Sequence, residues 1–157
     1  MSIEKVTAFF AQYGLENRIR VLEQSSATVA LAAQALGCPP ERIAKTLSFQ
    51  RSDGGARLVV AAGDAKIDNH KYKAQFGEKA KMLTPEQAVT LVGHAVGGVC
   101  PFAVNEGVEV CLDASLRRFE TVFPACGSSN SAIELTLPEL EQYSHPRQWV
   151  DVCKLPE

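Results

Sequence analysis

The chain has 157 residues, of which 46% are hydrophobic and 22% charged, and its formal net charge is −2. This length is typical of a single domain, so we expect one domain over residues 1–157. The slightly acidic balance argues against a protein that coats nucleic acid non-specifically, although it is compatible with a local basic patch. No apolar run approaches the ~20 residues of a membrane span, and the N-terminus lacks the layout of a signal peptide, so we expect a cytoplasmic protein without membrane contact.

The cysteines are scattered along the chain as Cys38, Cys100, Cys111, Cys126 and Cys153. They form no CxxC pair and show no zinc-ligand spacing, so the simplest interpretation is that they are small buried hydrophobic residues in a reducing compartment. The sequence also lacks a P-loop, a dinucleotide fingerprint and a GxSxG elbow. These absences predict a protein with no metal and no other cofactor.

Two helices are predicted in the first forty residues. Apolar residues at helical spacing predict an amphipathic helix over residues 2–13, with Ser2 as N-cap and Gly14 after its end. A group of capping hydroxyls at residues 25–28 then precedes a second helix over residues 29–36.

A β-hairpin is the strongest local signal in the chain. The Asp-Gly-Gly turn at residues 53–55 joins a strand over residues 45–50 to a strand over residues 57–62. Residues 41–44 form a candidate helical turn that leads into the first strand. The second strand is apolar on both faces, so we expect it to be central in its sheet.

The segment over residues 64–81 is rich in basic side chains and includes a predicted short helix over residues 68–76. Its basic residues are Lys66, His70, Lys71, Lys73, Lys79 and Lys81. Such a segment is either an ordinary solvated face or a docking surface for phosphate groups, which lysine binds as a point charge.

The second half of the chain alternates strands with single helices. Thr84 and Gln87 have the spacing of a capping box, which predicts a helix over residues 85–92 that Gly93 ends. Further strands are predicted over residues 108–112, 119–125, 133–137 and 149–153, with a helix over residues 138–143. This order of elements predicts an α+β fold with a mixed sheet that curls towards a barrel.

The loop that follows, residues 93–103, is a candidate pocket wall. Its adjacent glycines, Gly97 and Gly98, precede Cys100 and Pro101, which predicts a sharp turn that exposes main-chain N–H groups. Cys100 is either a nucleophile with a lowered pKa or a small packed thiol. A nucleophile would need one of the histidines at positions 70, 94 or 145 nearby, and sequence alone does not show proximity.

Lys45 is the second candidate for a functional group. Side-chain alternation along the strand places it on the same, buried face as Leu47 and Phe49. A charged side chain on a buried face requires a structural or functional explanation. It is a desolvated base, an electrostatic clamp on a carbonyl or phosphate, or a rim residue with a buried stem. Asp113 is either a solvated residue at the end of a strand or an acid that binds an amino group of a ligand beside the loop.

Four stretches of the sequence together resemble the YbaK/ProX family. They are Ala44-Lys45-Thr46-Leu47, residues 59–64, residues 93–102, and Gly127 with Ile133-Glu134-Leu135. The resemblance runs over residues 28–143, and that family is similar to the editing insertion of bacterial prolyl-tRNA synthetase. It implies a mixed, strongly curved sheet with flanking helices and a freestanding trans-editing enzyme that hydrolyses the ester of a mischarged tRNA.

The resemblance also implies the site residues. The residue matching the family's key lysine is Lys45, and the loop from Gly97 to Pro101 lines the aminoacyl pocket. The tRNA's own terminal hydroxyl helps to activate the attack in such proteins, so neither a protein nucleophile nor a metal is required. The predicted substrate-binding residues are Gly97, Gly98, Val99, Cys100, Pro101, His94, Thr46, Asp113, Gly127, Ser128 and Ser129.

Two departures from the family pattern leave the substrate open. Many members have serine where this chain has Cys100, and many have a basic turn where this chain has Gly127 to Ser131. We therefore expect a deacylase for a small amino acid such as alanine, cysteine, serine or threonine, active as a monomer or weak homodimer and with a synthetase as a further partner. The alternatives are a non-catalytic module of the same fold that binds tRNA or a synthetase, and a thiol enzyme that uses Cys100.

Overall fold

A mixed six-stranded sheet forms the centre of the computed structural model, which describes residues 2–156. Its strands, in spatial order, are β8 (Leu135–Thr136), β6 (Thr121–Pro124), β2 (Ile43–Gln50), β3 (Ala56–Ala62), β5 (Glu109–Asp113) and β9 (Gln148–Val150). The pairs β2–β3 and β6–β8 are antiparallel, whereas β2–β6, β3–β5 and β5–β9 are parallel. The predicted α+β class with a mixed sheet is confirmed.

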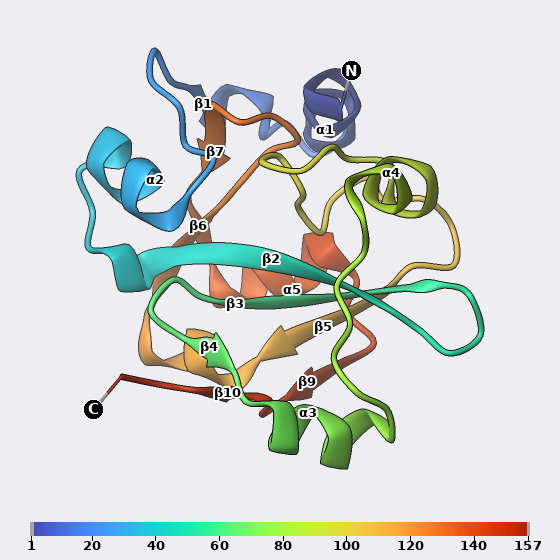
Figure 1. Ribbon diagram of the computed structural model, residues 1–157. Coiled ribbons are helices and arrows are strands. Elements are labelled where there is room, and N and C mark those ends of the chain that lie inside the picture. Colours follow the sequence, from blue (N-terminus) through green and yellow to red (C-terminus); the bar gives the residue numbers. More distant parts are fainter. Residues whose placement is uncertain (1, 157) are drawn as a thin grey trace.

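The β2–β3 hairpin crosses the middle of the molecule (Figure 1). Gly54 has φ +89° in its turn, a conformation that glycine adopts without a steric penalty. Every residue of β3 is buried, because helices and loops cover both faces of the sheet at this strand. The prediction that this strand is central is therefore confirmed.

Two short antiparallel pairs flank the main sheet. β1 (Ile19–Val21) pairs with β7 (Ser131–Ile133), and β4 (Lys66–Ile67) pairs with β10 (Cys153–Lys154). A single bridge between Ala125 and Ala132 connects the end of β6 to β7, so the edge of the sheet turns over. The sheet is thus the curled half-barrel that the sequence predicts.

Helices cover the two faces and the ends of this sheet (Figure 1). They are α1 (Ser2–Ala11), α2 (Val29–Leu36), α3 (Asn69–Phe76), α4 (Pro85–Gln87) and α5 (Leu137–Ser144), and a π-helical turn, η3 (Ala88–Val92), continues α4. The predicted Thr84–Gln87 capping box is present at α4. Among residues 2–156, no helix is both long and apolar enough to cross a membrane.

Several predicted boundaries are wrong. Helix α1 contains Ser2 instead of starting after it, and it ends at Ala11. Strand β2 begins at Ile43, because a 3-10 turn, η2 (Pro40–Arg42), ends there. A further 3-10 helix, η4 (Ala114–Arg118), which Asp113 caps, was not predicted.

The strands predicted over residues 133–137 and 149–153 are each broken in two. In the first case β7 ends at Ile133 and pairs with β1, whereas β8 begins at Leu135 and pairs with β6. The N-cap Thr136 then starts helix α5 at Leu137 and ends β8. In the second case β9 and β10 pair with different partners, β5 and β4, so the chain changes direction between them.

Glu139 ties α5 to the N-terminal part of the chain and predicts an acid-sensitive contact. Its carboxylate accepts hydrogen bonds from Arg18 Nη1 at 2.7 Å and from Thr136 N at 2.9 Å. The Arg18 hydrogen bond lowers the pKa of Glu139 from 4.5 to about 2. Because the folded-state pKa is depressed, this stabilisation is present above pH 4.5 and is lost as the pH falls from 4.5 to about 2.

We expect Glu139→Gln to lower the free energy of unfolding by about 1 kcal/mol at pH 7. Denaturant unfolding of both proteins between pH 7 and pH 2.5 measures this. The difference between the two proteins should shrink as the pH falls. A difference that stays constant with pH would contradict the ionic account of this contact.

Two hydrophobic clusters flank the sheet. The larger one contains the buried residues of α1, β3 and β5, with Phe10, Leu58 and Phe102 fully buried. The smaller one lies under α2 and contains Ala32, Ala33, Leu36, Ile43, Phe123 and Ala132. Members of the smaller cluster also form part of the wall of the cavity described below.

Candidate functional site

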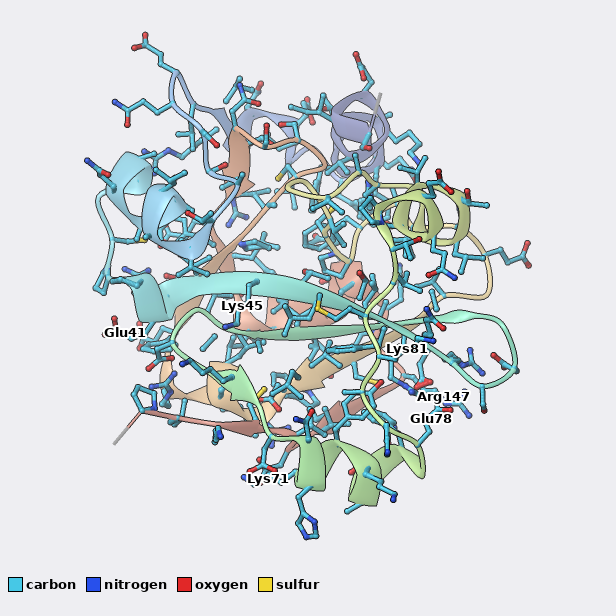
Figure 2. The ribbon with its side chains drawn as sticks, in the orientation of Figure 1. Glu41, Lys45, Lys71, Glu78, Lys81 and Arg147 are labelled. Atoms are coloured by element: carbon cyan, nitrogen blue, oxygen red, sulfur yellow. The ribbon has the colours of Figure 1, made fainter. Side chains whose placement is uncertain are left out.

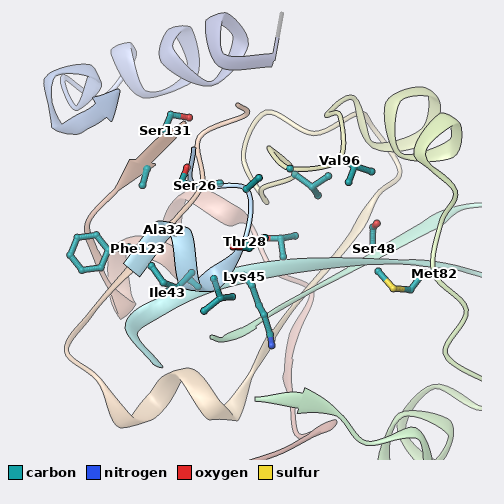
Figure 3. Close-up of a pocket in the computed structure, with 18 of the residues that line it drawn as sticks. Ser26, Thr28, Ala32, Ile43, Lys45, Ser48, Met82, Val96, Phe123 and Ser131 are labelled. Atoms are coloured by element: carbon teal, nitrogen blue, oxygen red, sulfur yellow. The ribbon is translucent and has the colours of Figure 1, made fainter. Parts of the chain in front are cut away.

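A cavity of about 190 Å³ opens between α2, β2 and the glycine-rich loop (Figure 3). Its walls come from residues 26–29 before α2, from residues 43–46 of β2, from residues 82–83, from the loop at residues 96–99, and from β6 and β7. Met82 and Val96 line it and are 57% and 65% exposed, which makes one edge of its mouth apolar. Exposed apolar side chains at the rim of a cavity are typical of a binding site.

Backbone hydrogen bonds hold the wall at residues 26–29 in place. Ser26 N donates to Ser129 O at 2.6 Å, and Leu22 N donates to Asn130 O at 2.7 Å. Thr28 then caps α2 by accepting a hydrogen bond from Leu31 N. The turn at residues 127–130 therefore supports this wall from behind.

The glycine-rich loop packs closely on the same turn. A Cβ atom at Gly98 would lie 2.6 Å from Ser128 N and 2.7 Å from Gly127 C, both of them backbone atoms. Gly97 has φ +95° and lines the cavity, as does Val99. The structure thus brings together the predicted loop and the predicted Gly127–Ser129 turn, because only a residue without a side chain fits at position 98.

Lys45 lines the cavity with its stem, but its ammonium group lies at the far end. Lys45 Nζ donates hydrogen bonds to the carbonyl oxygens of Gly63, at 3.3 Å, and of Ala65. Figure 3 shows the side chain extending away from Val96 and Ser26. Burial lowers the pKa of the Lys45 ammonium, while Cys153 and Asp64 oppose this shift.

The close approach of two chain segments positions the carbonyl groups that hold Lys45. A Cβ atom at Gly63 would lie 2.0 Å from Pro40 O and 2.8 Å from Val29 Cγ1. Gly63 lies in one of the stretches that resemble the family and was predicted only to end the strand before it. The signal in the sequence for a close approach of two segments at this point was a glycine directly after the apolar strand β3.

Two residues that line the cavity have hydroxyl groups without a hydrogen-bond partner among residues 2–156. Ser26 Oγ and Thr46 Oγ1 are both buried and unpaired. Thr46 was a predicted site residue, whereas Ser26 was predicted only as one of several capping hydroxyls. Side-chain alternation on β2 also places Ser48 on the cavity wall, and this residue was not predicted either.

Cys100 and His94 belong to the loop at residues 93–103 but do not line the cavity. Both are fully buried, and Pro101 is buried as well. His94 Nε2 donates a hydrogen bond to Phe102 O at 2.7 Å, and Cys100 Sγ lies 3.6 Å from the same nitrogen. Burial raises the pKa of Cys100 to about 12. This geometry does not favour a thiolate nucleophile, because the thiol stays protonated and has no access to a substrate.

Two further predicted sets of site residues, Asp113 and the Gly127–Ser129 turn, take structural positions. Asp113 Oδ2 accepts a hydrogen bond from Ser115 N and Asp113 Oδ1 accepts one from Val152 N, each at 2.9 Å. Asp113 therefore holds the C-terminal segment and does not face the cavity. Gly127, Ser128 and Ser129 form the supporting layer behind the loop.

Within residues 2–156 there is no group of three or more His, Cys, Asp or Glu side chains that could hold a metal ion.

Most of the chain matches the model of a known protein family. Residues 23–143 match the model of the aminoacyl-tRNA editing domain. The chain belongs to this family. The matched region contains every wall of the cavity, together with Lys45 and the glycine-rich loop.

Two other proteins show how far the sequence similarity extends. The uncharacterized protein YwhH of Bacillus subtilis (strain 168) is 53% identical over 154 residues, which cover 98% of each chain. A proline–tRNA ligase of Thermotoga sp. (strain RQ2) is 31% identical over 91 residues, which are 57% of this chain but only 15% of the ligase. This editing-domain chain is thus similar to a small part of a much larger synthetase.

Solved structures show the same fold over nearly the whole chain. A proposed trans-editing enzyme for prolyl tRNA synthetase has a TM-score of 0.86 at 28% identity, and the match covers 98% of this chain and 97% of that one. The hypothetical protein APE2540 has a TM-score of 0.83 at 29% identity, with 96% and 99% covered. The predicted resemblance to the prolyl-tRNA synthetase editing fold is therefore confirmed.

Proposed function

We propose that this protein is a trans-editing deacylase that hydrolyses the ester between a small amino acid and the terminal ribose of a mischarged tRNA. The observation that carries the proposal is one cavity that Lys45 lines together with Gly97 and Val99 of the glycine-rich loop. The family supports an editing role, and the proposed trans-editing enzyme among the solved structures supports action on a tRNA that a synthetase has released.

The size of the cavity fits the acyl part of this substrate. An engineered cavity of about 150 Å³ binds benzene, a ligand of six heavy atoms. A cavity of about 190 Å³ therefore has room for the aminoacyl group of alanine, cysteine, serine or threonine but not for a whole nucleotide. The terminal adenosine would remain at the mouth, beside the apolar side chains of Met82 and Val96.

Each element of the site has a role in the proposed reaction. A water molecule attacks the ester carbonyl carbon, and the carbonyl oxygen gains negative charge. The bond between that carbon and the ribose oxygen then breaks, and the proton that the water loses is transferred to the ribose oxygen, so the amino acid and the tRNA with a free terminal hydroxyl are released. Main-chain N–H groups of the glycine-rich loop stabilise the developing oxyanion. The Lys45 ammonium exchanges one of its carbonyl partners for the oxyanion or for the terminal phosphate, which favours the same transition state.

A binding module of the same fold is the second candidate. The observation that favours it is the position of the Lys45 ammonium, which two backbone carbonyls already satisfy. Such a module would hold mischarged tRNA without turnover. A synthetase partner and a weak homodimer are compatible with either candidate.

Release of labelled amino acid from a mischarged tRNA separates the two candidates. With the protein in excess over seryl- or alanyl-tRNA and a chelator present, we expect hydrolysis much faster than in buffer alone. Stable binding of the charged tRNA at the buffer rate of hydrolysis would favour the binding module.

Two lysines on the β4–β10 pair predict where the tRNA backbone binds. Lys66 and Lys154 are exposed and lie directly opposite each other in this pair. Like charges in this position destabilise a sheet unless an anion lies between them. Lys66 also contributes to the lowered pKa of Lys45, although burial contributes more, so its charge acts close to the Lys45 ammonium.

We expect the double variant Lys66→Gln, Lys154→Gln to weaken tRNA binding and to reduce the slope of log Kd against log salt concentration by about 2. A filter-binding titration at four salt concentrations measures this slope. Lys79→Gln, which removes an exposed lysine outside the pair, is the matched control. An unchanged slope in the double variant would show that the phosphates bind elsewhere.

A further inference from the structure

The turn that binds the Lys45 ammonium is a small unit with a hydrogen bond of its own. Lys45 Nζ donates to the carbonyl oxygens of Gly63 and Ala65. Figure 2 shows the Lys45 side chain extending from β2 towards the segment that joins β3 to β4. Ala65 N donates a hydrogen bond to Ala62 O at 3.0 Å, which closes residues 62–65 into a β-turn. The position of this turn therefore sets the position of the ammonium.

The 3-10 helix η4 binds this turn at two points. Ser115 Oγ accepts a hydrogen bond from Ala62 N at 3.1 Å, and this contact is buried. Arg118 donates to both carboxylate oxygens of Asp64, from Nη1 at 3.1 Å and from Nη2 at 2.6 Å. Arg118 Nε also donates to Ser115 O at 3.0 Å, which fixes the guanidinium on η4. Because a bidentate pair fixes orientation as well as distance, η4 holds the turn in one arrangement.

Asp64 lies between the two residues whose carbonyl groups bind Lys45, and its charge acts on the same ammonium. The hydrogen bond from Arg118 lowers the pKa of Asp64, so the carboxylate is ionised at neutral pH. Burial lowers the pKa of Lys45, and the Asp64 charge is one of those that oppose this shift. Without Arg118 this carboxylate would be free to pair with the Lys45 ammonium directly. Arg118 therefore keeps Asp64 from competing with a substrate for Lys45.

We infer that η4 is a brace for the Lys45 ammonium, and that Arg118 and Asp64 are positioning residues for the proposed reaction. The inference rests on the proposed function, in which Lys45 favours the transition state, and it adds two residues that do not line the cavity. Both act through the turn at residues 62–65. A shift of about 1 Å in a positioning element costs roughly a hundredfold in rate, so we expect a partial shift to cost about tenfold.

The position of Lys45 is measurable without any substrate. In a lysine held in one conformation the two Hε protons have different chemical shifts, whereas in a mobile lysine they coincide. Proton–carbon NMR spectra of the wild type, Arg118→Gln and Asp64→Asn give these shifts, and Lys45→Met identifies the signal by its loss. We expect two resolved Hε shifts in the wild type and a merged signal in both variants. A merged signal in the wild type, or signals that neither variant changes, would overturn the inference.

Kinetics separate positioning from direct binding of tRNA. Single-turnover deacylation with increasing excess of protein gives the rate at saturation and the protein concentration at half saturation. Arg118→Gln should lower the saturated rate about tenfold and leave the half-saturation concentration unchanged. Arg118→Lys keeps the charge but not the bidentate fork, so it should recover only part of the lost rate. Weaker binding at an unchanged saturated rate would assign Arg118 to a tRNA phosphate and overturn the inference.

Combined variants test whether the effect passes through Lys45. In a Lys45→Met background, Arg118→Gln should have no further effect on the rate, because the group that it positions is gone. The double variant Asp64→Asn, Arg118→Gln should lose no more activity than the larger of the two single losses. Losses that multiply in either combination would show that Arg118 acts independently of its two proposed partners, which would also overturn the inference.

Arg18→Gln is the matched control. Arg18 and Glu139 form a second bidentate pair, with Nη1 and Nη2 at 2.7 and 3.1 Å from the carboxylate oxygens. The two side chains are 39% and 28% exposed, against 35% and 19% for Arg118 and Asp64. This pair ties the N-terminal part of the chain to α5 and not to the turn that binds Lys45. Its loss should leave both the Lys45 signal and the saturated rate unchanged.

The two kinds of measurement distinguish this inference from the proposed function. Lys45 signals that move in Arg118→Gln and Asp64→Asn, with no hydrolysis by the wild type at any protein concentration, would support the brace and refute the deacylase. Hydrolysis that Lys45→Met abolishes but Arg118→Gln leaves at the wild-type rate would support the deacylase and overturn the brace.

Discussion

Replacement of Lys45 with alanine is expected to lower the rate of deacylation at least a hundredfold. Removal of one group that stabilises a developing oxyanion typically costs a factor of about 10²–10³. The ammonium group lies in a half-buried position where charge interactions are weakly screened, and its stem lines the cavity. Single-turnover hydrolysis of the preferred charged tRNA measures the effect.

Two further variants separate charge from packing. Lys45→Met keeps an apolar stem of similar length, so it should retain the fold and lose the same activity as the alanine variant. Lys66→Met removes a neighbouring, exposed lysine and should lower the rate far less at saturating tRNA. If Lys45→Met retained the wild-type rate, the ammonium would have no part in the reaction, and the role of Lys45 would be limited to packing.

Replacement of Gly98 with alanine is expected to damage both stability and activity. The new Cβ would lie 2.6–2.8 Å from backbone atoms of Gly127 and Ser128, which cannot rotate away as a side chain can. Overpacking of this kind costs about 1–3 kcal/mol of unfolding free energy. The loop must then move away from its supporting turn, and a shift of about 1 Å in a positioning element costs roughly a hundredfold in rate.

Gly107→Ala is the control for this variant. Gly107 has φ +89° with open space around it, so alanine there introduces backbone strain of about 1–2 kcal/mol without displacing the glycine-rich loop. We expect similar stability losses in the two variants and a rate loss only in Gly98→Ala. Thermal unfolding and deacylation of the same preparations test this. Full activity in a folded Gly98→Ala protein would mean that the position of the loop does not matter for the reaction.

Local patterns were sufficient to predict much of the fold. The Asp-Gly-Gly turn predicted the β2–β3 hairpin, and the continuous apolar run predicted the buried strand β3. The Thr84–Gln87 box marked the start of α4. The breaks in the strands predicted over residues 133–137 and 149–153 were missed, because each is a change of pairing partner that depends on contacts distant in sequence.

The candidate site was only partly predictable, for a physical reason. Lys45 and the adjacent glycines Gly97 and Gly98 stand out in the sequence, and Lys45 and Gly97 do line the cavity. Ser26 has no such signal, since a serine before a helix is usually a cap. Whether Cys100 faces a substrate or the core depends on how the loop packs on the Gly127–Ser129 turn, and a single sequence does not contain that information.

The most direct test of the central proposal is a deacylation panel. The wild-type protein and Lys45→Ala are each incubated with tRNAs that carry proline, alanine, cysteine, serine or threonine, and release of the amino acid is followed over time. The account predicts rapid release of a small amino acid by the wild-type protein, slow release of proline, and a loss of at least a hundredfold in the variant. Release at the buffer rate from all five tRNAs, or equal rates for the wild type and the variant, would contradict it.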